Sequence, residues 1–498
     1  MASSFLSKDY MQRVVGAHGA SPVCRDVVPG ILFLVALFGI VTLGASGASS
    51  GFDHLIPAGV NVTTKEQRLV GMAAAYGAGG GAVTTMIYYL LMACSPLLLI
   101  IGGQVMIIAT LAISAALFVH AAQTKAAQNL DASGLLVASA IQAGMALLIL
   151  LWLCCIRKRI AFTAAVLGQV ARTLARLPEL IVLQFVATVI AVGYACVCVL
   201  AALKANDLLD EHYESIGVPR SGWSHLALNI GAFLALAWGG LVIVNISFVT
   251  TAGGIATCYF EGPAHAGCRA CCGSLGRALS FQFGSIAFGS LIVAMVNTLV
   301  YIIRLGAEQA RHTDNGLLKL IFCCCLCCMQ CFERTVEWLT SYAFVYVAIY
   351  GTSFLSSGRA VMGLLGKSGV GAVATSTLID PVLTLGTLLG CGAGCALGYV
   401  AARGWNNLSA PDNFSEFQSE VVMIDNIVGI VAGGVAALAV ASIGLAPVDA
   451  GAKSLFVCYA EEPQKLALDS PALAAKISEA AGEHRALGGG GRAGLIRA

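Results

Sequence analysis

The chain has 498 residues, of which 58% are hydrophobic and only 11% are charged. A soluble protein normally carries about 25% charged residues, so the composition excludes an ordinary soluble domain and predicts an all-α, polytopic membrane protein. The net charge is only +2, and the basic residues are scattered between apolar runs. No nucleic-acid partner is therefore expected.

Ten apolar segments are long enough to cross a bilayer as helices, which takes about 20 residues each. The residues before the first of them are mixed polar, so no cleavable signal peptide is evident. We therefore expect a cytoplasmic N-terminal segment (1–26), a transmembrane transporter domain (27–460) and a cytoplasmic, partly disordered tail (461–498). The predicted spans are Val27–Ser46, Gly81–Ile101, Gly103–His120, Gly134–Ile156, Leu180–Leu203, Trp223–Tyr259, Phe281–Ile303, Trp338–Ser357, Leu378–Ala401 and Val421–Ala446.

Prolines and glycines add detail to these spans. The second and third spans are nearly contiguous and predict a tight hairpin, with Pro96 as a kink inside the second. Pro381 is expected at the start of the ninth span, where proline is tolerated. The ninth span also has a glycine at every fourth position from 386 to 398. Such a ridge predicts close helix packing in lipid, with a gating hinge as the alternative.

Basic residues set the expected orientation, because cytoplasmic loops are enriched in Lys and Arg. Residues 157–176 carry five basic residues and no acid, whereas residues 204–220 are mainly acidic. Counting from these loops places both termini in the cytoplasm. One loop disagrees, since the basic residues between the seventh and eighth spans fall on the outer side. Either the segment around 322–338 partly re-enters the membrane, or one span is miscounted.

Three glycosylation sequons lie in loops that this count places outside. They begin at Asn61, Asn407 and Asn413, and they predict a glycoprotein.

The 19 cysteines crowd at two places, residues 268–272 and 323–331. Cys268–Cys271 and Cys328–Cys331 have the spacing of metal ligands, while packing at the membrane surface and acylation are the alternatives. We expect no metal and no cofactor.

The spans contain no acid placed securely at mid-depth, and no catalytic motif stands out. What they offer are mid-span aromatic and amide side chains. Individually these are typical of anchoring and packing, but as a set they permit an aromatic box of the kind that binds quaternary ammonium groups. The candidate substrate-binding residues are Tyr194, Trp238, Asn245, Asn297, Tyr346 and Tyr350.

Several stretches resemble choline transporter-like proteins. The longest is Cys324–Gly366, with its cysteine cluster followed by AFVYVAIYGTSF. Residues 277–290 are similar to the family's seventh span, 248–259 to the end of its sixth, and 448–449 with 456–462 to its C-terminal signature. The resemblance covers roughly residues 133–465. The short loop at 47–80 looks more like fungal, plant and protist members, and Glu461–Leu466 departs from the family's C-terminal element.

The resemblance implies a ten-span transporter rather than an enzyme. It implies carriage of choline, or a related amino alcohol such as ethanolamine, to supply phospholipid synthesis. Transport would be sodium-independent, facilitated or in exchange for protons. The setting would be the plasma membrane or an organelle membrane, with membrane lipids as further partners. We expect the trimethylammonium group among the four aromatic candidates, with Asn245 or Asn297 at the hydroxyl. A lipid-metabolism enzyme and a non-transporting scaffold are the alternatives.

Overall fold

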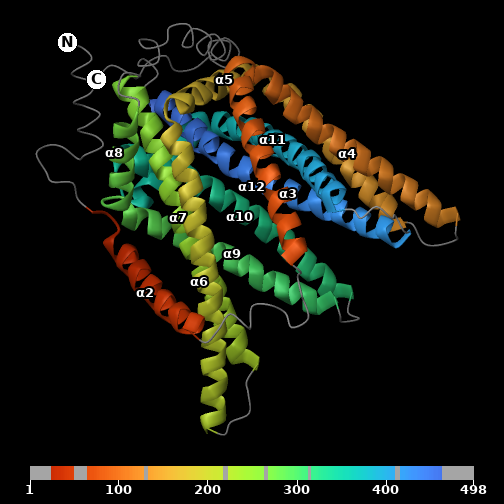
Figure 1. Ribbon diagram of the computed structural model, residues 1–498. Coiled ribbons are helices and arrows are strands. Elements are labelled where there is room, and N and C mark those ends of the chain that lie inside the picture. Colours follow the sequence, from red (N-terminus) through yellow and green to blue (C-terminus); the bar gives the residue numbers. More distant parts are fainter. Residues whose placement is uncertain are drawn as a thin grey trace, which may run out of the picture. The chain divides into compact units, whose positions relative to one another are not determined.

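The computed structural model describes residues 24–49, 64–127, 133–216, 222–262, 267–311, 316–409 and 416–461. These ranges form helices joined by short connections and contain no strand. The all-α prediction is therefore confirmed. The chain divides into two compact units, one within residues 1–61 and 176–367 and the other within 62–175 and 368–498. Figure 1 labels the helices of both.

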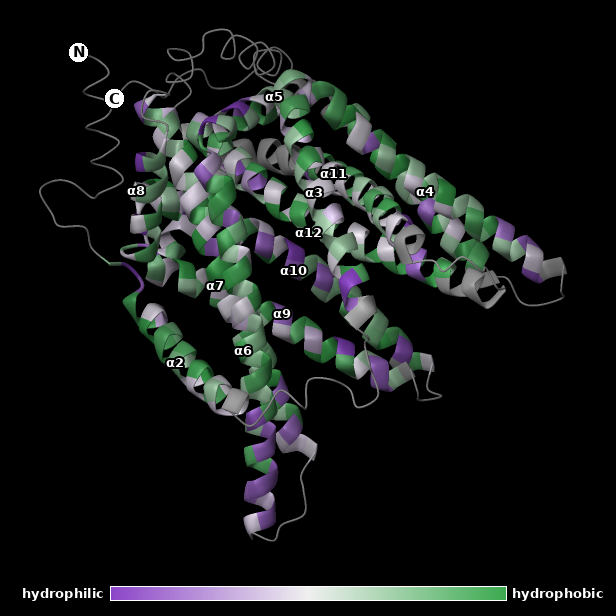
Figure 2. Ribbon diagram, in the orientation of Figure 1, coloured by the Kyte–Doolittle hydropathy of each residue, from purple (hydrophilic) through white to green (hydrophobic). Residues whose placement is uncertain are grey.

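Nine helices in the described ranges are long and apolar enough to cross a membrane. Figure 2 shows hydrophobic residues along most of their length. Many large apolar side chains on these helices are exposed, for example Phe38 at 73% and Val189 at 71%. Apolar surface on this scale is typical of a protein surrounded by lipid. The chain is a multi-pass membrane protein.

The first unit is organised around α7, whose C-terminal half is buried almost continuously. This helix packs against α6, α8, α9 and α10, while α2 lies against α6 and α9. Small side chains, among them Gly253 and Gly254, fill the buried half of α7 and let its neighbours approach closely. The helices of this unit are α2 (Val27–Ser49), α6 (Pro178–Ile216), α7 (Gly222–Glu261), α8 (Cys268–Leu279), α9 (Phe283–Arg311), α10 (Gly316–Tyr350) and, up to residue 367, the start of α11 (Phe354–Ser409).

The second unit contains α3 (Thr64–Cys94), α4 (Pro96–Ala127), most of α5 (Ser133–Arg176), α12 (Glu416–Glu461) and, from residue 368, α11 (Phe354–Ser409). The glycine ridge of α11 lies directly on α12. A Cβ added at Gly398 would stand 2.1 Å from the carbonyl oxygen of Gly429, and one at Gly394 would stand 2.2 Å from Cβ of Ala437. The ridge is thus a close helix contact, as the packing alternative predicts.

Several predicted boundaries are wrong. Pro96 does not kink the second span, because α3 ends at Cys94 and Pro96 begins α4. A proline suits a first helical position because the missing N–H has no partner there in any case. Pro381, expected at a helix start, lies inside α11. The loop at 157–176 is the continuation of α5.

Other predictions lie outside the described residues. These are the sequons at Asn61 and Asn413, the side chain of Asn407, the tail beyond residue 461 and the first 23 residues. The proposed division at residues 26 and 460 therefore stays a prediction.

Candidate functional site

The predicted eighth span, Trp338–Ser357, is interrupted. Helix α10 ends at Tyr350 and α11 begins at Phe354, so residues 351–353 leave the helix. Gly351 adopts a φ of +61°, a left-handed conformation that glycine reaches without a steric penalty. The prediction of one continuous helix is wrong because the length of an apolar run does not reveal such a turn. We call residues 351–353 the α10–α11 break.

Side chains from a distant part of the sequence satisfy both ends of this break. The backbone N–H of Phe354 donates to Asp26 Oδ2 at 2.8 Å, and Ser285 Oγ donates to the same oxygen at 2.6 Å. Gln282 Nε2 donates to the carbonyl oxygen of Val347 at 2.9 Å, in the last turn of α10. Helix ends leave backbone groups without partners. Asp26 supplies a partner at the start of α11, and Gln282 adds a second donor at the Val347 carbonyl, which also accepts the Gly351 N–H at 2.9 Å.

The residues before α2 are held against the start of α9. Arg25 N–H donates to the carbonyl oxygen of Phe281, and Asp26 has a left-handed φ of 50°. A Cβ at Gly284 would lie 2.2 Å from the carbonyl oxygen of Asp26. Only a glycine at 284 permits this approach, so the short segment 24–26 is fitted to the start of α9.

Helix α10 runs antiparallel to α9, since Gln282 before α9 contacts the end of α10. With its amide oriented to donate, Asn297 Nδ2 lies 3.0 Å from the carbonyl oxygen of Val293 and 3.3 Å from Glu333 Oε1. Asn297 belongs to the candidate span Phe283–Ala310. Glu333 lies about 25 Å from Tyr350 along α10 at 1.5 Å per residue. Because Asn297 is near the middle of the candidate span Phe283–Ala310, its contact with Glu333 places a carboxylate beside the middle of that span.

Glu333 was missed from the sequence, which showed no acid at mid-depth. The apolar run used to define the eighth span begins at Trp338, five positions later. The helix itself extends back to Gly316. Glu333 lies at the level of Asn297 because α10 packs against α9. Hydropathy along one segment does not reveal this pairing.

Trp238 and Asn245 lie on one contact between α7 and α9. Trp238 Nε1 donates to the carbonyl oxygen of Ala287 at 2.9 Å, and Asn245 Nδ2 donates to Ser290 Oγ at 2.9 Å. The indole ring also meets the edge of Phe33, with ring centroids 5.3 Å apart. These two candidates stabilise the helix contact from within.

Tyr194 belongs to the α6–α7 contact instead. Its hydroxyl donates to the carbonyl oxygen of Ala235 at 2.8 Å, and its ring lies over Gly239, where a Cβ would approach it to 2.1 Å. Tyr346 and Tyr350 stack on each other with centroids 5.6 Å apart, immediately before the break. The structure thus assembles the tyrosine pair but distributes Tyr194 and Trp238 over other helix contacts. Their role as substrate ligands stays a prediction.

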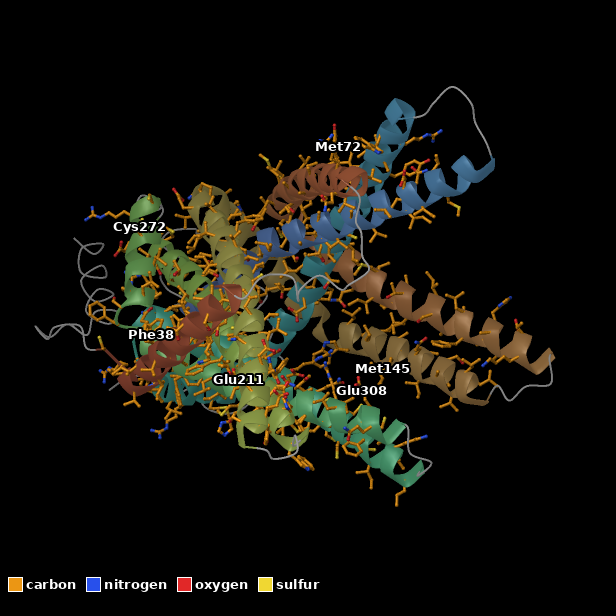
Figure 3. The ribbon with its side chains drawn as sticks, turned by 60° about the horizontal axis from the view of Figure 1, so that its bottom comes forward. Phe38, Met72, Met145, Glu211, Cys272 and Glu308 are labelled. Atoms are coloured by element: carbon orange, nitrogen blue, oxygen red, sulfur yellow. The ribbon has the colours of Figure 1, made fainter. Side chains whose placement is uncertain are left out.

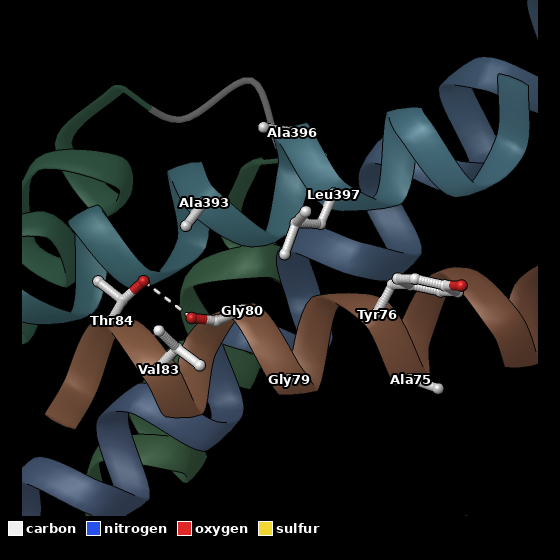
Figure 4. Close-up of a pocket in the computed structure, with 9 residues that line it drawn as sticks. All are labelled: Ala75, Tyr76, Gly79, Gly80, Val83, Thr84, Ala393, Ala396 and Leu397. Atoms are coloured by element: carbon white, nitrogen blue, oxygen red, sulfur yellow. Dashed lines mark hydrogen bonds between the residues drawn. The ribbon is translucent and has the colours of Figure 1, made fainter. Parts of the chain in front are cut away.

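A groove of about 810 Å³ in the second unit contains none of these candidates. Its lining is apolar except for Tyr76 and Thr84, and the Thr84 hydroxyl donates to the carbonyl oxygen of Gly80 at 2.8 Å (Figure 4). It offers no charge to a cation. The lining residues are Ala75, Tyr76, Gly79, Gly80, Val83, Thr84, Ala393, Ala396 and Leu397.

The cysteine cluster at 323–331 lies on α10, and its six thiols are exposed and free. In the described part of the chain, no three His, Cys, Asp or Glu side chains are close enough together to hold a metal ion. Acylation and contact with the membrane surface remain the alternatives for this cluster.

Comparison with known proteins gives one family. Residues 140–464 match the model of a family described as plasma-membrane choline transporters. The chain is 25% identical to Protein PNS1 of Mycosarcoma maydis over 317 residues, which is 64% of this chain and 58% of that protein. It is 28% identical to a CTL-like protein of Dictyostelium discoideum over 332 residues, 66% of this chain and 54% of that one.

An animal relative aligns over a shorter stretch. Choline transporter-like protein 2 of Xenopus laevis is 34% identical over 164 residues, 32% of this chain and 23% of that protein. Overall the chain spans about half the length of the fungal and amoebal relatives that it matches.

Proposed function

Because the chain belongs to the family of plasma-membrane choline transporters, we propose that it carries choline across a membrane. The observation that carries the proposal is the match over residues 140–464, which includes all of α6 to α12 and the break. A multi-pass helical bundle with an interrupted helix supports it. Transporters often build their substrate sites where helices are discontinuous and side chains satisfy the freed backbone groups.

We place the substrate along α10. The trimethylammonium group of choline is permanently positive and has no N–H to donate. Aromatic faces and carboxylates therefore recognise it. Glu333, held by Asn297, supplies a carboxylate, and the stacked pair Tyr346 and Tyr350 supplies aromatic faces beside the break. Tyr194, Trp238 and Asn245 remain candidates at the neighbouring helix contacts.

Access to the tyrosine pair requires movement, because Tyr346 is only 4% exposed. The α10–α11 break is a natural place for it, since residues 351–353 lie outside both helices and Gly351 tolerates large φ changes. Alternating access would then involve opening and closing around this break, with Asp26 and Gln282 holding one state.

The finer assignments rest on the family resemblance. They are plasma-membrane residence, acceptance of ethanolamine, independence from sodium, and facilitated or proton-exchanging transport that supplies phospholipid synthesis. Uptake measurements in defined buffers can resolve the ethanolamine, sodium and proton assignments.

Uptake of radiolabelled choline into cells that lack their own choline transport tests the proposal. The full chain is expected to raise uptake above that of empty-vector cells, and unlabelled choline is expected to compete. Sodium replacement, a pH gradient and ethanolamine competition address the finer assignments in the same assay. Uptake equal to the empty vector, with the protein present at the cell surface, would contradict the proposal.

A further inference from the structure

The short helix α8 lies outside the candidate spans, between the end of α7 at Glu261 and the start of α9 at Phe283. One face of α8 is buried against the first unit and carries Ala270, Cys271, Ser274 and Ala278. Ser274 Oγ donates to the carbonyl oxygen of Thr250 at 2.9 Å and fixes this face to α7. The rest of the helix surface is therefore presented in a defined direction.

Beside the buried face runs a second stripe at positions i, i+4, i+7 and i+11. It consists of Cys268, Cys272, Leu275 and Leu279, and we call it the thiol–leucine stripe. Both cysteines are exposed, and Leu279 is 54% exposed. Figure 3 shows Cys272 on the outer flank of α8. The two sulfur atoms lie 3.5 Å apart.

Helix α8 has the character of an interfacial helix, because this stripe lies on one side and the exposed Arg269 lies next to it. Counting basic residues along the chain places the loop containing α8 on the cytoplasmic side. There, an arginine favours the anionic leaflet, and cysteines stay reduced. Exposed cysteines on an amphipathic helix beside a membrane span are the usual acceptors of reversible fatty acylation.

We propose that Cys268 and Cys272 are S-acylated with long-chain fatty acids, which anchor α8 in the membrane interface. The acceptor is the exposed thiol pair, and the chains extend alongside Leu275 and Leu279 into the lipid. The reaction is a thioester exchange with a long-chain acyl-CoA. The cysteine sulfur bonds to the acyl carbon, the bond from that carbon to the CoA sulfur breaks, and the cysteine proton ends on the released CoA thiol.

The geometry argues against the other uses of a thiol pair. Helical positions four apart hold their Cβ atoms about 5–6 Å from each other, whereas a disulfide needs about 3.5–4.5 Å, so oxidation would require α8 to unwind. A closed soft-metal site needs further ligands, and the described ranges contain no group of three or more candidate ligands.

The third cysteine of α8 provides a matched control. Burial raises the pKa of the Cys271 thiol to about 11, so this side chain is both inaccessible and protonated. Hydrogen bonding to Cys272 raises the pKa of Cys268 as well. The raised pKa keeps the Cys268 thiol protonated near pH 7, so its acylation calls for a transferase that accepts the proton rather than for spontaneous reaction.

The test uses the full chain expressed in a eukaryotic cell and recovered from membranes with free thiols blocked. Fragments covering residues 268–272 are analysed by mass spectrometry before and after neutral hydroxylamine, which cleaves thioesters. We expect hydroxylamine-releasable acyl groups on Cys268 and Cys272 and none on Cys271. Cys268→Ser with Cys272→Ser is expected to abolish the signal from α8, whereas Cys271→Ser leaves it unchanged.

Unmodified thiols at both positions would overturn the proposal, provided that an endogenous acylated membrane protein in the same sample is detected as modified. A disulfide between Cys268 and Cys272, or a bound metal, would overturn it too. The measurement does not depend on choline transport, so the two proposals fail separately. If acylation anchors α8, the double serine variant is also expected to lose interfacial attachment, seen as faster proteolysis of residues 262–282 in intact membranes.

Discussion

Glu333 faces Asn297 across the α9–α10 pair, with Asn297 inside a candidate span. An ionisable side chain in such a position is costly, and it is usually retained because it contacts a substrate or an ion. Glu333→Gln keeps an oxygen that accepts from Asn297 but removes the charge. We expect KM for choline to rise about tenfold, equivalent to roughly 1.4 kcal/mol of lost binding, with similar protein levels.

Glu308→Gln makes the same chemical change at an exposed position on α9. Figure 3 labels Glu308. It is expected to leave KM unchanged. If Glu333→Gln and Glu308→Gln give the same KM as the unaltered chain, the carboxylate has no part in recognising the cation.

Asp26 connects three segments through a single carboxylate oxygen. Asp26→Ala removes both hydrogen bonds and leaves the first turn of α11 without its cap, so we expect a loss of about 1–3 kcal/mol in the free energy of unfolding. Asp26→Asn keeps an acceptor oxygen and is expected to lose less. Thermal unfolding in detergent measures both.

Asp207 is exposed on α6, and Asp207→Ala serves as the reference for losing a carboxylate. The maximal rate of uptake is expected to fall more for Asp26→Ala than for Asp207→Ala, since Asp26 stabilises one arrangement of the break. Equal unfolding temperatures and equal rates for the two alanine variants would show that segment 24–26 is a passive contact.

At the residue scale, the sequence predicted which side chains are polar or aromatic within the spans but not their partners. Trp238 and Asn245 share the α7–α9 contact, while Tyr194 bonds within α6–α7. Hydropathy reports depth and periodicity, and neither specifies which helix faces which. Glu333 was missed for the same reason.

Helix α11 depends on its glycine ridge for the contact with α12. At Gly398, an added Cβ would lie 2.1 Å from the carbonyl oxygen of Gly429, so Gly398→Ala must separate two backbones. We expect it to lower the free energy of unfolding by about 1–3 kcal/mol, as overpacking does. Gly392 lies on the same helix with nothing within 4 Å of its Cβ position.

Gly392→Ala is therefore expected to be neutral or mildly stabilising, because alanine favours the helix by about 1 kcal/mol relative to glycine. Comparing the unfolding temperatures of the two variants in one detergent isolates the helix contact from helix propensity. Should both variants unfold at the same temperature, the ridge would not be the packing surface described.

At the element scale, the apolar runs located the helices well but not their ends. Ser95, rather than Gly102, separates α3 from α4, and α5 continues through the basic stretch that was expected to be a loop. Polar residues in the last turns of a long helix look like loop residues when only hydropathy is considered. The break at 351–353 was hidden for the opposite reason, because apolar residues flank it on both sides.

At the scale of the whole molecule, the class was predictable because 11% charge cannot cover a soluble protein of this size. The division into two compact units was not, since it brings residues before 62 together with residues after 175. That pairing results from contacts between helices distant in the sequence. The family resemblance, which rested on several separate motifs, is confirmed by the match over residues 140–464.

Choline transport by the purified chain is the central claim, and proteoliposomes test it without other cellular proteins. The full chain, reconstituted in lipid vesicles, is given radiolabelled choline outside. We predict saturable accumulation inside the vesicles that excess unlabelled choline suppresses and that Glu333→Gln shifts to higher choline concentration. Entry no faster than into protein-free vesicles, with folded protein confirmed in the bilayer, would contradict the account.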